Sequence, residues 1–250
     1  MFYSKKLTKI REIKHCFFSR KGGFSKGIYK GLNCGKGSKD DKKKILKNLN
    51  IVSKKMQVNS KNLILMHQTH SNKVVEITKK NQRQKIKSDA IITKMNNLAL
   101  GVLTADCVPI LLYDYKNKII GCIHAGWRGA FSGVIKNTVI KIKKLNSSNK
   151  IYASIGPCIG TKSYEVDFSF YKKFILKSKK NSKYFISKNK NKKLFNLRRY
   201  VSDKLKELKV DFDHVNYDTF CEKNYFFSYR RSRILKHDDY GRCISVIRIL

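Results

Sequence analysis

Three short segments of the chain combine histidine or cysteine with small residues, and each lies at or near the end of an apolar run. They are residues 67–70 (His-Gln-Thr-His), 104–107 (Thr-Ala-Asp-Cys) and 124–129 (His-Ala-Gly-Trp-Arg-Gly). Thiolate and imidazole are the ligands that a borderline-soft ion such as Zn²⁺ prefers, and three protein ligands leave a fourth position for water or substrate. These segments therefore indicate a catalytic metal site rather than a structural one.

Each of these residues also has a common structural explanation when it is taken alone. A single Cys107 is more often a small buried hydrophobe, and a single His124 is more often a hydrogen-bonded core histidine. His67 and His70 are three residues apart, so they would share a face on a helix, and one of them would then be a supporting or capping residue. Spacing by itself leaves the choice between these two histidines open.

A β-hairpin would bring two of the candidate ligands together. A two-residue loop at 116–117 places His124 opposite Pro109, whereas a loop at 115–116 places Cys107 directly opposite His124. In both registers Cys107 and His124 lie on the same face, because side chains alternate along a strand, and a slip of one residue would separate them. The chain has three apolar runs of strand length, residues 98–103, 108–113 and 119–123, and the last two would form this hairpin.

The glycine-rich segment after His124 predicts a strand, a tight turn and a helix. The turn from Gly126 to Gly129 would present free N–H groups and the positive end of a helix dipole to an anion, with Arg128 beside it. A second glycine turn leads into the carboxylate of Glu165. The elements indicate a mixed α/β class rather than a purely parallel sheet; the others expected are strands at 74–77, 151–155 and 243–250 and a helix near 197–208.

The composition is that of a globular protein, with 41% apolar and 29% charged residues. No apolar run approaches the roughly 20 residues that cross a bilayer, and the N-terminus lacks the apolar core of a signal peptide. Seven cysteines without a Cys-x-x-Cys pair fit a reduced protein better than a disulfide scaffold. We therefore expect one domain over residues 1–250, in the cytoplasm, with no membrane partner and an undefined oligomeric state.

The net charge of +39 would attract polyanions non-specifically. Lysine accounts for 45 of the 56 basic residues, whereas specific recognition of phosphates and bases favours the bidentate guanidinium of arginine. The lysines are spread along the chain, as drift in an AT-rich genome would produce, and no nucleic-acid-binding motif is present. We expect no specific nucleic-acid partner. The densest stretch, from Lys172 to Lys193, predicts a helix, a basic loop and a short strand.

The motifs together resemble the laccase-domain family typified by YfiH. The resemblance spans nearly the whole chain, and its weakest part is the lysine-rich stretch. The matching segments are residues 19–25, 32–33, 67–70, 89–90, 104–109, 124–129, 156–160, 164–166 and 226–231.

This resemblance implies a single four-layer α/β/β/α sandwich with mixed sheets and a bound zinc ion. It implies that the zinc ligands are His70, Cys107 and His124, which selects His70 over His67. The implied activities are phosphorolysis of purine nucleosides (adenosine, inosine, guanosine and methylthioadenosine) and deamination of adenosine. Purine nucleosides and phosphate would be the partners. Polyphenol oxidation and peptidoglycan editing are also attributed to the family.

Chemistry separates these activities. A multicopper oxidase needs many imidazoles, usually in His-x-His pairs. The chain has six histidines and no such pair, which disfavours copper and polyphenol oxidation. Deamination fits a zinc site built by two histidines and Cys107, and it needs a proton carrier. Phosphorolysis needs an anion pocket. The candidates are Glu165 and Asp106 for the proton carrier, and Arg128 and Gly129 with Arg20 or Arg230 for the anion pocket.

Two other classes of function compete with this interpretation. Cys107 activated by His124 would be the nucleophile of a hydrolase that edits peptidoglycan precursors. Alternatively, the protein would be a basic binding module with a vestigial site. Stoichiometric zinc on the thiolate would count against the first, and nucleoside turnover would count against the second.

Overall fold

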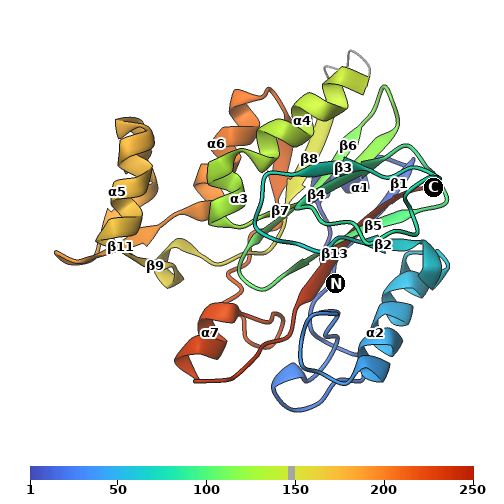
Figure 1. The fold of residues 1–250 in the computed structure, drawn as a ribbon, viewed down its shortest axis with the longest axis horizontal. Helices are drawn as coiled ribbons and strands as arrows, with labels where there is room; N and C mark the ends of the chain where they lie inside the picture. Colours follow the sequence, from blue (N-terminus) through green and yellow to red (C-terminus); the bar gives the residue numbers. More distant parts are fainter. Residues whose placement is uncertain (146–149) are drawn as a thin grey trace.

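A computed structural model describes residues 1–145 and 150–250. At the centre of the molecule, two mixed β-sheets pack face to face (Figure 1). One sheet has six strands in the order β12-β8-β6-β7-β4-β3, and the other has four in the order β1-β13-β5-β2. Both contain parallel and antiparallel pairs, as predicted. The strands are β12 Asp211–His214, β8 Ile151–Ile155, β6 Val108–Asp114, β7 Ile119–Ala125, β4 Ala90–Thr93, β3 Val74–Glu76, β1 Ile13–Phe17, β13 Cys243–Ile249, β5 Ala99–Thr104 and β2 Leu63–Leu65.

Helices cover the outer face of each sheet, on opposite sides of the molecule (Figure 1). Helices α4 and α6 bury one apolar face each on the six-stranded sheet, including Val139 and Leu205. Helix α2 buries Leu49 and Val52 on the four-stranded sheet. The four layers confirm the predicted α/β/β/α sandwich. The helices are α1 Lys5–Thr8, α2 Lys42–Lys55, α3 Trp127–Ser132, α4 Val134–Leu145, α5 Phe168–Lys177, α6 Leu197–Glu207 and α7 Tyr229–Ile234, with 3-10 turns η1 Gly27–Tyr29, η2 Ser60–Asn62, η3 Thr161–Ser163 and η4 Lys179–Tyr184.

The predicted hairpin is formed by β6 and β7, and its register is the first of the two that the sequence allows. Pro109 pairs with His124, and Val108 pairs with Ala125. Because side chains alternate along each strand, Cys107 and His124 are on the face that looks toward the four-stranded sheet. This is the face on which Leu111 packs in the core between the sheets.

Two connections carry the chain from the four-stranded to the six-stranded sheet. Residues 66–73 join β2 to β3, and residues 105–107 join β5 to β6. The first contains the predicted His67 and His70. It is not helical, because His70 adopts a left-handed backbone conformation with φ of 58°. The connections 66–73 and 105–107, which are distant in sequence, therefore meet at the edge where the chain crosses from one sheet to the other.

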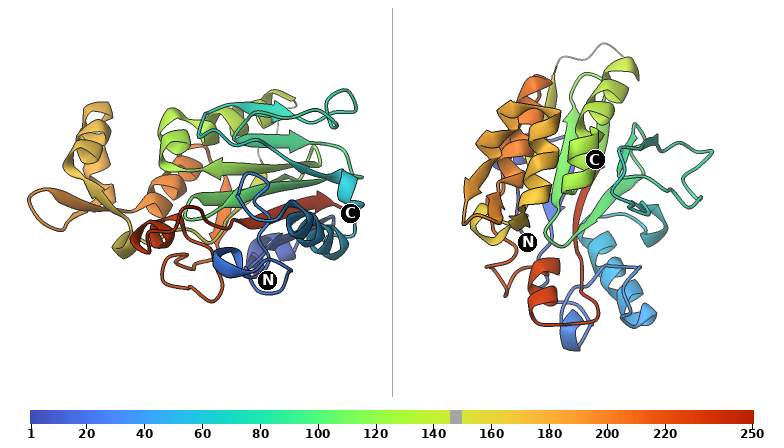
Figure 2. Two further views of the ribbon diagram at one scale, coloured as in Figure 1. Left: turned by 60° about the horizontal axis from the view of Figure 1, so that its bottom comes forward. Right: turned by 60° about the vertical axis from the view of Figure 1, so that its left-hand side comes forward.

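The lysine-rich stretch folds into a unit that projects from the sandwich (Figures 1 and 2). It supplies most of helix α5, the 3-10 turn η4 and strand β10, which agrees with the predicted helix, basic loop and short strand. A small sheet holds this unit together, with the order β10 Phe185–Ser187, β11 Lys192–Phe195 and β9 Glu165–Asp167. In the described part of the chain, no helix combines the length and apolar character that a bilayer crossing demands.

Candidate metal centre and active site

The structure brings three of the four candidate ligands together. The ligand atoms of His70, Cys107 and His124 lie within 4.8 Å of one another. The Cys107 Sγ is 3.8 Å from the His70 Nε2, and the two imidazoles stand edge to face with ring centres 4.8 Å apart. His67 is exposed and outside this group, and its backbone pairs with the segment around Lys87. Tertiary structure thus separates the two histidines that spacing left equivalent.

The three ligands come from the two crossing connections and from the end of β7. Their burial is graded, since His70 is exposed, Cys107 is partly buried and His124 is buried. The centre therefore has a closed side within the sandwich and an open side toward solvent. A site of this shape can hold an ion and still admit a substrate.

The electrostatics favour a charge-separated pair at this centre. Burial would raise the pKa of the Cys107 thiol, but the adjacent His124 and His70 outweigh it and lower that pKa to about 6. Burial would lower the pKa of His124, but Cys107 and Asp89 outweigh it and raise that pKa to about 9. Cys107 is accordingly a thiolate at neutral pH, which is the form that binds metals and acts as a nucleophile.

Asp89 is a site residue to which the sequence analysis assigned no role, although it lies in one of the matching segments, residues 89–90. Its carboxylate lies 2.8 Å from the His124 Nδ1 and is fully buried. The Nδ1 proton then points to Asp89, so Nε2 is the ring atom that would bind a metal ion, which would displace the Nε2 proton of the charged ring. Asp89 stands directly before the apolar residues 90–92, and this unusual position for a carboxylate, together with the matching segment 89–90, is the signal that the sequence offers for it.

Gly126 leaves the space that the ligand cluster occupies. A Cβ at this position would lie 2.8 Å from the His70 Cδ2 and 2.9 Å from the Cys107 Sγ. Both distances are well inside ordinary van der Waals contact. Any side chain larger than hydrogen would therefore displace two of the three ligands.

A cavity of about 540 Å³ opens beside the cluster, and both His70 and Cys107 line it. Aromatic side chains form its walls. Trp127 packs edge to face on Phe170 with ring centres 4.7 Å apart, and Tyr229 packs on Tyr240 at 5.1 Å. The remaining lining residues are Ala105, Asp106, Arg128, Ile159, Tyr164, Glu165, Val166, Asp167, Leu197 and Arg230.

Four of the predicted charged residues line this cavity, namely Arg230, Arg128, Glu165 and Asp106. The Arg230 Nη2 donates to the backbone oxygen of Glu165 at 2.7 Å, and its guanidinium carbon is 5.6 Å from the ring centre of Tyr164. Arg128 is exposed and lies over the Trp127 ring at 5.3 Å. The Glu165 carboxylate pairs with Lys188, and this ion pair lowers its pKa, so the carboxylate stays ionised at the cavity rim.

Asp106 also borders the cavity, but its carboxylate is engaged by protein groups. It accepts hydrogen bonds from the Thr219 hydroxyl at 2.7 Å, the Ser228 hydroxyl at 2.9 Å and the backbone N–H of Arg230 at 2.7 Å. These bonds tie the start of helix α7, which carries Tyr229 and Arg230, to the crossing connection that carries Cys107. The contacts indicate that Asp106 positions one wall of the cavity.

Two predicted anion-binding residues lie elsewhere. Gly129 is buried in helix α3, where a Cβ would meet the Ser71 carbonyl oxygen at 2.9 Å, so it allows close packing of the connection that carries His70. Arg20 donates to the Lys30 carbonyl oxygen and stacks on Phe227 at 4.3 Å. It lines a separate hollow.

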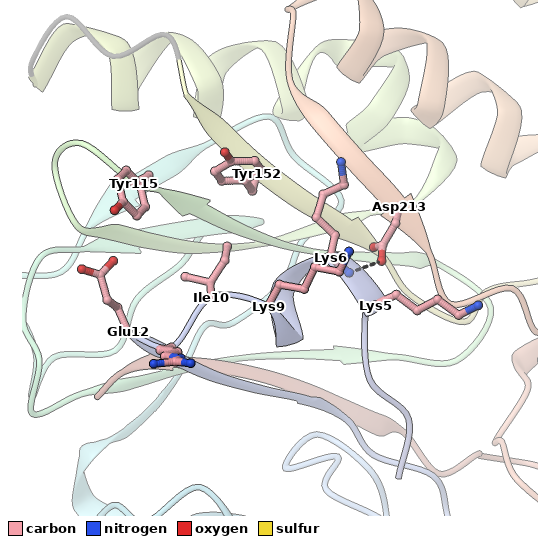
Figure 3. A pocket seen from close by; sticks show the side chains of 9 residues that line it. Lys5, Lys6, Lys9, Ile10, Glu12, Tyr115, Tyr152 and Asp213 are labelled. Atoms are coloured by element: carbon pink, nitrogen blue, oxygen red, sulfur yellow. Dashed lines mark hydrogen bonds between the residues drawn. The ribbon is translucent and has the colours of Figure 1, made fainter.

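A larger hollow, of about 700 Å³, lies at the far end of the β6–β7 hairpin (Figure 3). Figure 3 shows the lysines of α1 on one side and Tyr115 and Tyr152 on the other. It is ~20 Å from the ligand cluster, the length of the intervening strand. No histidine or cysteine lines it within the described residues. We therefore assign the candidate active site to the smaller cavity, where the reactive groups are.

Comparisons with known proteins identify related sequences and a similar fold. The family described as multi-copper polyphenol oxidoreductase laccase matches residues 14–250. A purine nucleoside phosphorylase of Rickettsia conorii is 38% identical over 194 residues, which are 75% of this chain and 78% of the relative. One of Haemophilus influenzae is 32% identical over 93% of both chains. The crystal structure of the Bacillus licheniformis hypothetical protein YfiH superimposes with a TM-score of 0.88 at 26% identity, over 95% of this chain and 93% of that one.

Proposed function

The chain belongs to the multi-copper polyphenol oxidoreductase laccase family, and from that premise we propose that it is a purine nucleoside phosphorylase that also deaminates adenosine. In phosphorolysis, a phosphate oxygen forms a bond to C1′ of the ribose. The bond from C1′ to the purine N9 breaks, and its electron pair leaves with the base. The relatives named purine nucleoside phosphorylase, at 32% and 38% identity, support this activity. The proposed substrates are adenosine, inosine, guanosine and methylthioadenosine.

One observation carries the proposal: a single cavity combines the ligand cluster, two guanidinium groups and aromatic walls. A purine ring stacks on aromatic side chains, at about 1–3 kcal/mol per base, and Tyr229 with Tyr240 offers such a surface. A guanidinium binds phosphate through paired charge-assisted hydrogen bonds, and we propose this role for Arg230 and Arg128, which line the cavity. The cavity thus has complementary groups for both substrates.

The residues at the cluster fit a zinc ion. The donors are two imidazoles and a thiolate, Asp89 orients His124, and Gly126 keeps the space beside the donors clear. We propose that His70, Cys107 and His124 hold Zn²⁺, which supplies Lewis-acid chemistry when it is bound. Copper is disfavoured, because in the described chain only two of the six histidines gather at this cluster.

We propose that two side chains lining the cavity, Tyr164 and Glu165, donate and accept protons. Burial raises the pKa of Tyr164, so its hydroxyl stays protonated and can donate a hydrogen bond to the departing purine. Glu165 is ionised and can accept a proton from the attacking water in deamination, which replaces the amino group of adenosine by oxygen and releases ammonia. Asp106, the other candidate, has its carboxylate oxygens occupied, and we propose a positioning role for it.

A second candidate function rests on the Cys107 thiolate beside His124. A free thiolate of this kind is also the nucleophile of a cysteine hydrolase, so an editing hydrolase for peptidoglycan precursors is the alternative. Zinc bound to the thiolate would exclude that role.

The seven unpaired cysteines support a reducing compartment, and we propose the cytoplasm.

Metal analysis combined with chromatography of nucleosides tests the proposal. Adenosine and inosine are incubated with the purified protein, with and without phosphate. Phosphate-dependent release of adenine or hypoxanthine together with ribose 1-phosphate is the expected result. Formation of inosine from adenosine without phosphate reports deamination. The proposed function fails if neither product forms with zinc-loaded protein.

Matched variants assign the activity to the site. Cys107→Ala should lose both stoichiometric zinc and turnover, whereas His67→Ala should keep both, because His67 is exposed and outside the cluster. Glu165→Gln should reduce deamination more than phosphorolysis if Glu165 carries the proton. Equal turnover by wild type and Cys107→Ala would show that the site is wrongly assigned.

A further inference from the structure

Asp89 links two of the three candidate ligands through one carboxylate. It precedes strand β4 and is fully buried between the connection 66–73 and β7. Its Oδ1 accepts a hydrogen bond from the His70 N–H at 2.9 Å and contacts the His124 Nδ1 at 2.8 Å. A single oxygen atom therefore joins the backbone of one histidine to the ring of another.

The same carboxylate holds the loop that carries His70. Three consecutive backbone N–H groups, those of Thr69, His70 and Ser71, point at it at 2.6–3.2 Å, and the Ser71 hydroxyl donates at 2.7 Å. Consecutive amides that converge in this way form an anion-binding nest. The nest includes His70 at its φ of 58°, a conformation that residues other than glycine rarely adopt. The negative charge of Asp89 stabilises this conformation.

We propose that Asp89 is the positioning residue of the metal centre and that it fixes both histidines before any ion binds. This inference rests on the proposed use of His70, Cys107 and His124 as metal ligands. Asp89 does not touch the ion or the substrate. It selects the Nδ1–H form of His124, leaving Nε2 as the ligand atom, and it holds the backbone from which His70 projects.

An asparagine at this position would be a poor replacement because it offers one acceptor oxygen and one amide donor. The donor would face backbone N–H groups or the His124 Nδ1–H, all of which are donors. Loss of a residue that orients metal ligands typically costs 10–100-fold in metal affinity. We expect a loss of this size for Asp89→Asn.

The matched control is Asp218→Asn. Asp218 is also a hydrogen-bonded carboxylate, which accepts from the Ser163 hydroxyl at 2.6 Å and the Phe220 N–H at 2.9 Å, but it contacts none of the three ligands. Zinc affinity is measured by chelator competition, and Co²⁺ is used as a spectroscopic probe of the Cys107 thiolate. Asp89→Asn should bind zinc 10–100-fold more weakly with altered cobalt bands, whereas Asp218→Asn should stay within about twofold of wild type.

A measurement on the wild type keeps the inference testable if Asp89→Asn does not fold. Nitrogen NMR of the histidine rings in zinc-loaded protein should show a proton on the His124 Nδ1 that exchanges slowly with water. Wild-type zinc affinity and cobalt bands in Asp89→Asn would overturn the inference, as would an unprotonated His124 Nδ1 or zinc binding that survives Cys107→Ala. None of these readouts depends on nucleoside turnover, so a failure of the proposed phosphorylase activity is distinguishable.

Discussion

A methyl group added at Gly126 should disable the candidate centre with little effect on the rest of the fold. Alanine accepts the backbone conformation of Gly126, with φ of −67° and ψ of 164°, so the cost comes from contacts. The new Cβ would lie 2.8 Å from the His70 Cδ2 and 2.9 Å from the Cys107 Sγ. Ordinary contact at ~3.5–4.0 Å requires these side chains to move by roughly 0.6–1.2 Å. Displacement of reacting groups by ~1 Å costs about 10²-fold in rate.

We therefore expect Gly126→Ala to lower kcat/KM for phosphorolysis about 10²-fold, which corresponds to about 2.7 kcal/mol of transition-state stabilisation. Zinc affinity, measured by chelator competition, should fall in the same variant. Gly37→Ala is the control, because a Cβ there meets no atom within 4 Å. Thermal unfolding of both variants separates a local effect from loss of the fold. If Gly126→Ala kept zinc affinity and kcat/KM within threefold of wild type, the cluster would not be the reactive centre.

Three further predictions follow from other parts of the structure. Burial lowers the pKa of His15 to about 4, and a backbone N–H donates to its Nε2 at 2.9 Å. In the unfolded chain the His15 ring is therefore protonated below about pH 6.5, whereas in the native protein it stays neutral down to about pH 4. As the pH falls through that window, the free energy of unfolding should decrease by about 1.4 kcal/mol per pH unit, to a total of about 3 kcal/mol. Urea unfolding at pH 7, 5.5 and 4.5 measures this slope, and the His15→Gln variant should not show it. Arg230→Ala should raise the KM for phosphate at least tenfold, whereas Arg20→Ala should change it less than twofold in steady-state assays, because Arg20 lines a separate hollow; equal effects would contradict the proposed phosphate position. Tyr229→Ala should raise the KM for nucleoside about tenfold through lost stacking, and Tyr115→Ala, equally exposed at the far end of the hairpin, should not.

Local patterns were sufficient to predict much of the sandwich. The apolar runs around the 114–118 turn predicted β6 and β7, and strand parity placed Cys107 and His124 on one face. The lysine-rich stretch was correctly expected to contain a helix and a short strand. These features depend on residues close together in the chain, so periodicity and turn composition determine them. The order of the layers came from the family resemblance, and the structure confirms it.

The residue types also predicted a metal centre, since thiolate and imidazole are the donors that a borderline-soft ion such as Zn²⁺ prefers, and the structure brings such a donor set together. Which residues gather there was decided by tertiary structure. The pairing of β2 with β5 and of β3 with β4 makes residues 66–73 cross between the sheets, and this crossing brings His70 to Cys107 while His67 stays apart. The same crossing carries the backbone amides that surround Asp89. Local periodicity determines only the face that a side chain takes within its own element. Distances between elements depend on long-range strand pairing, and only the folded chain establishes that pairing.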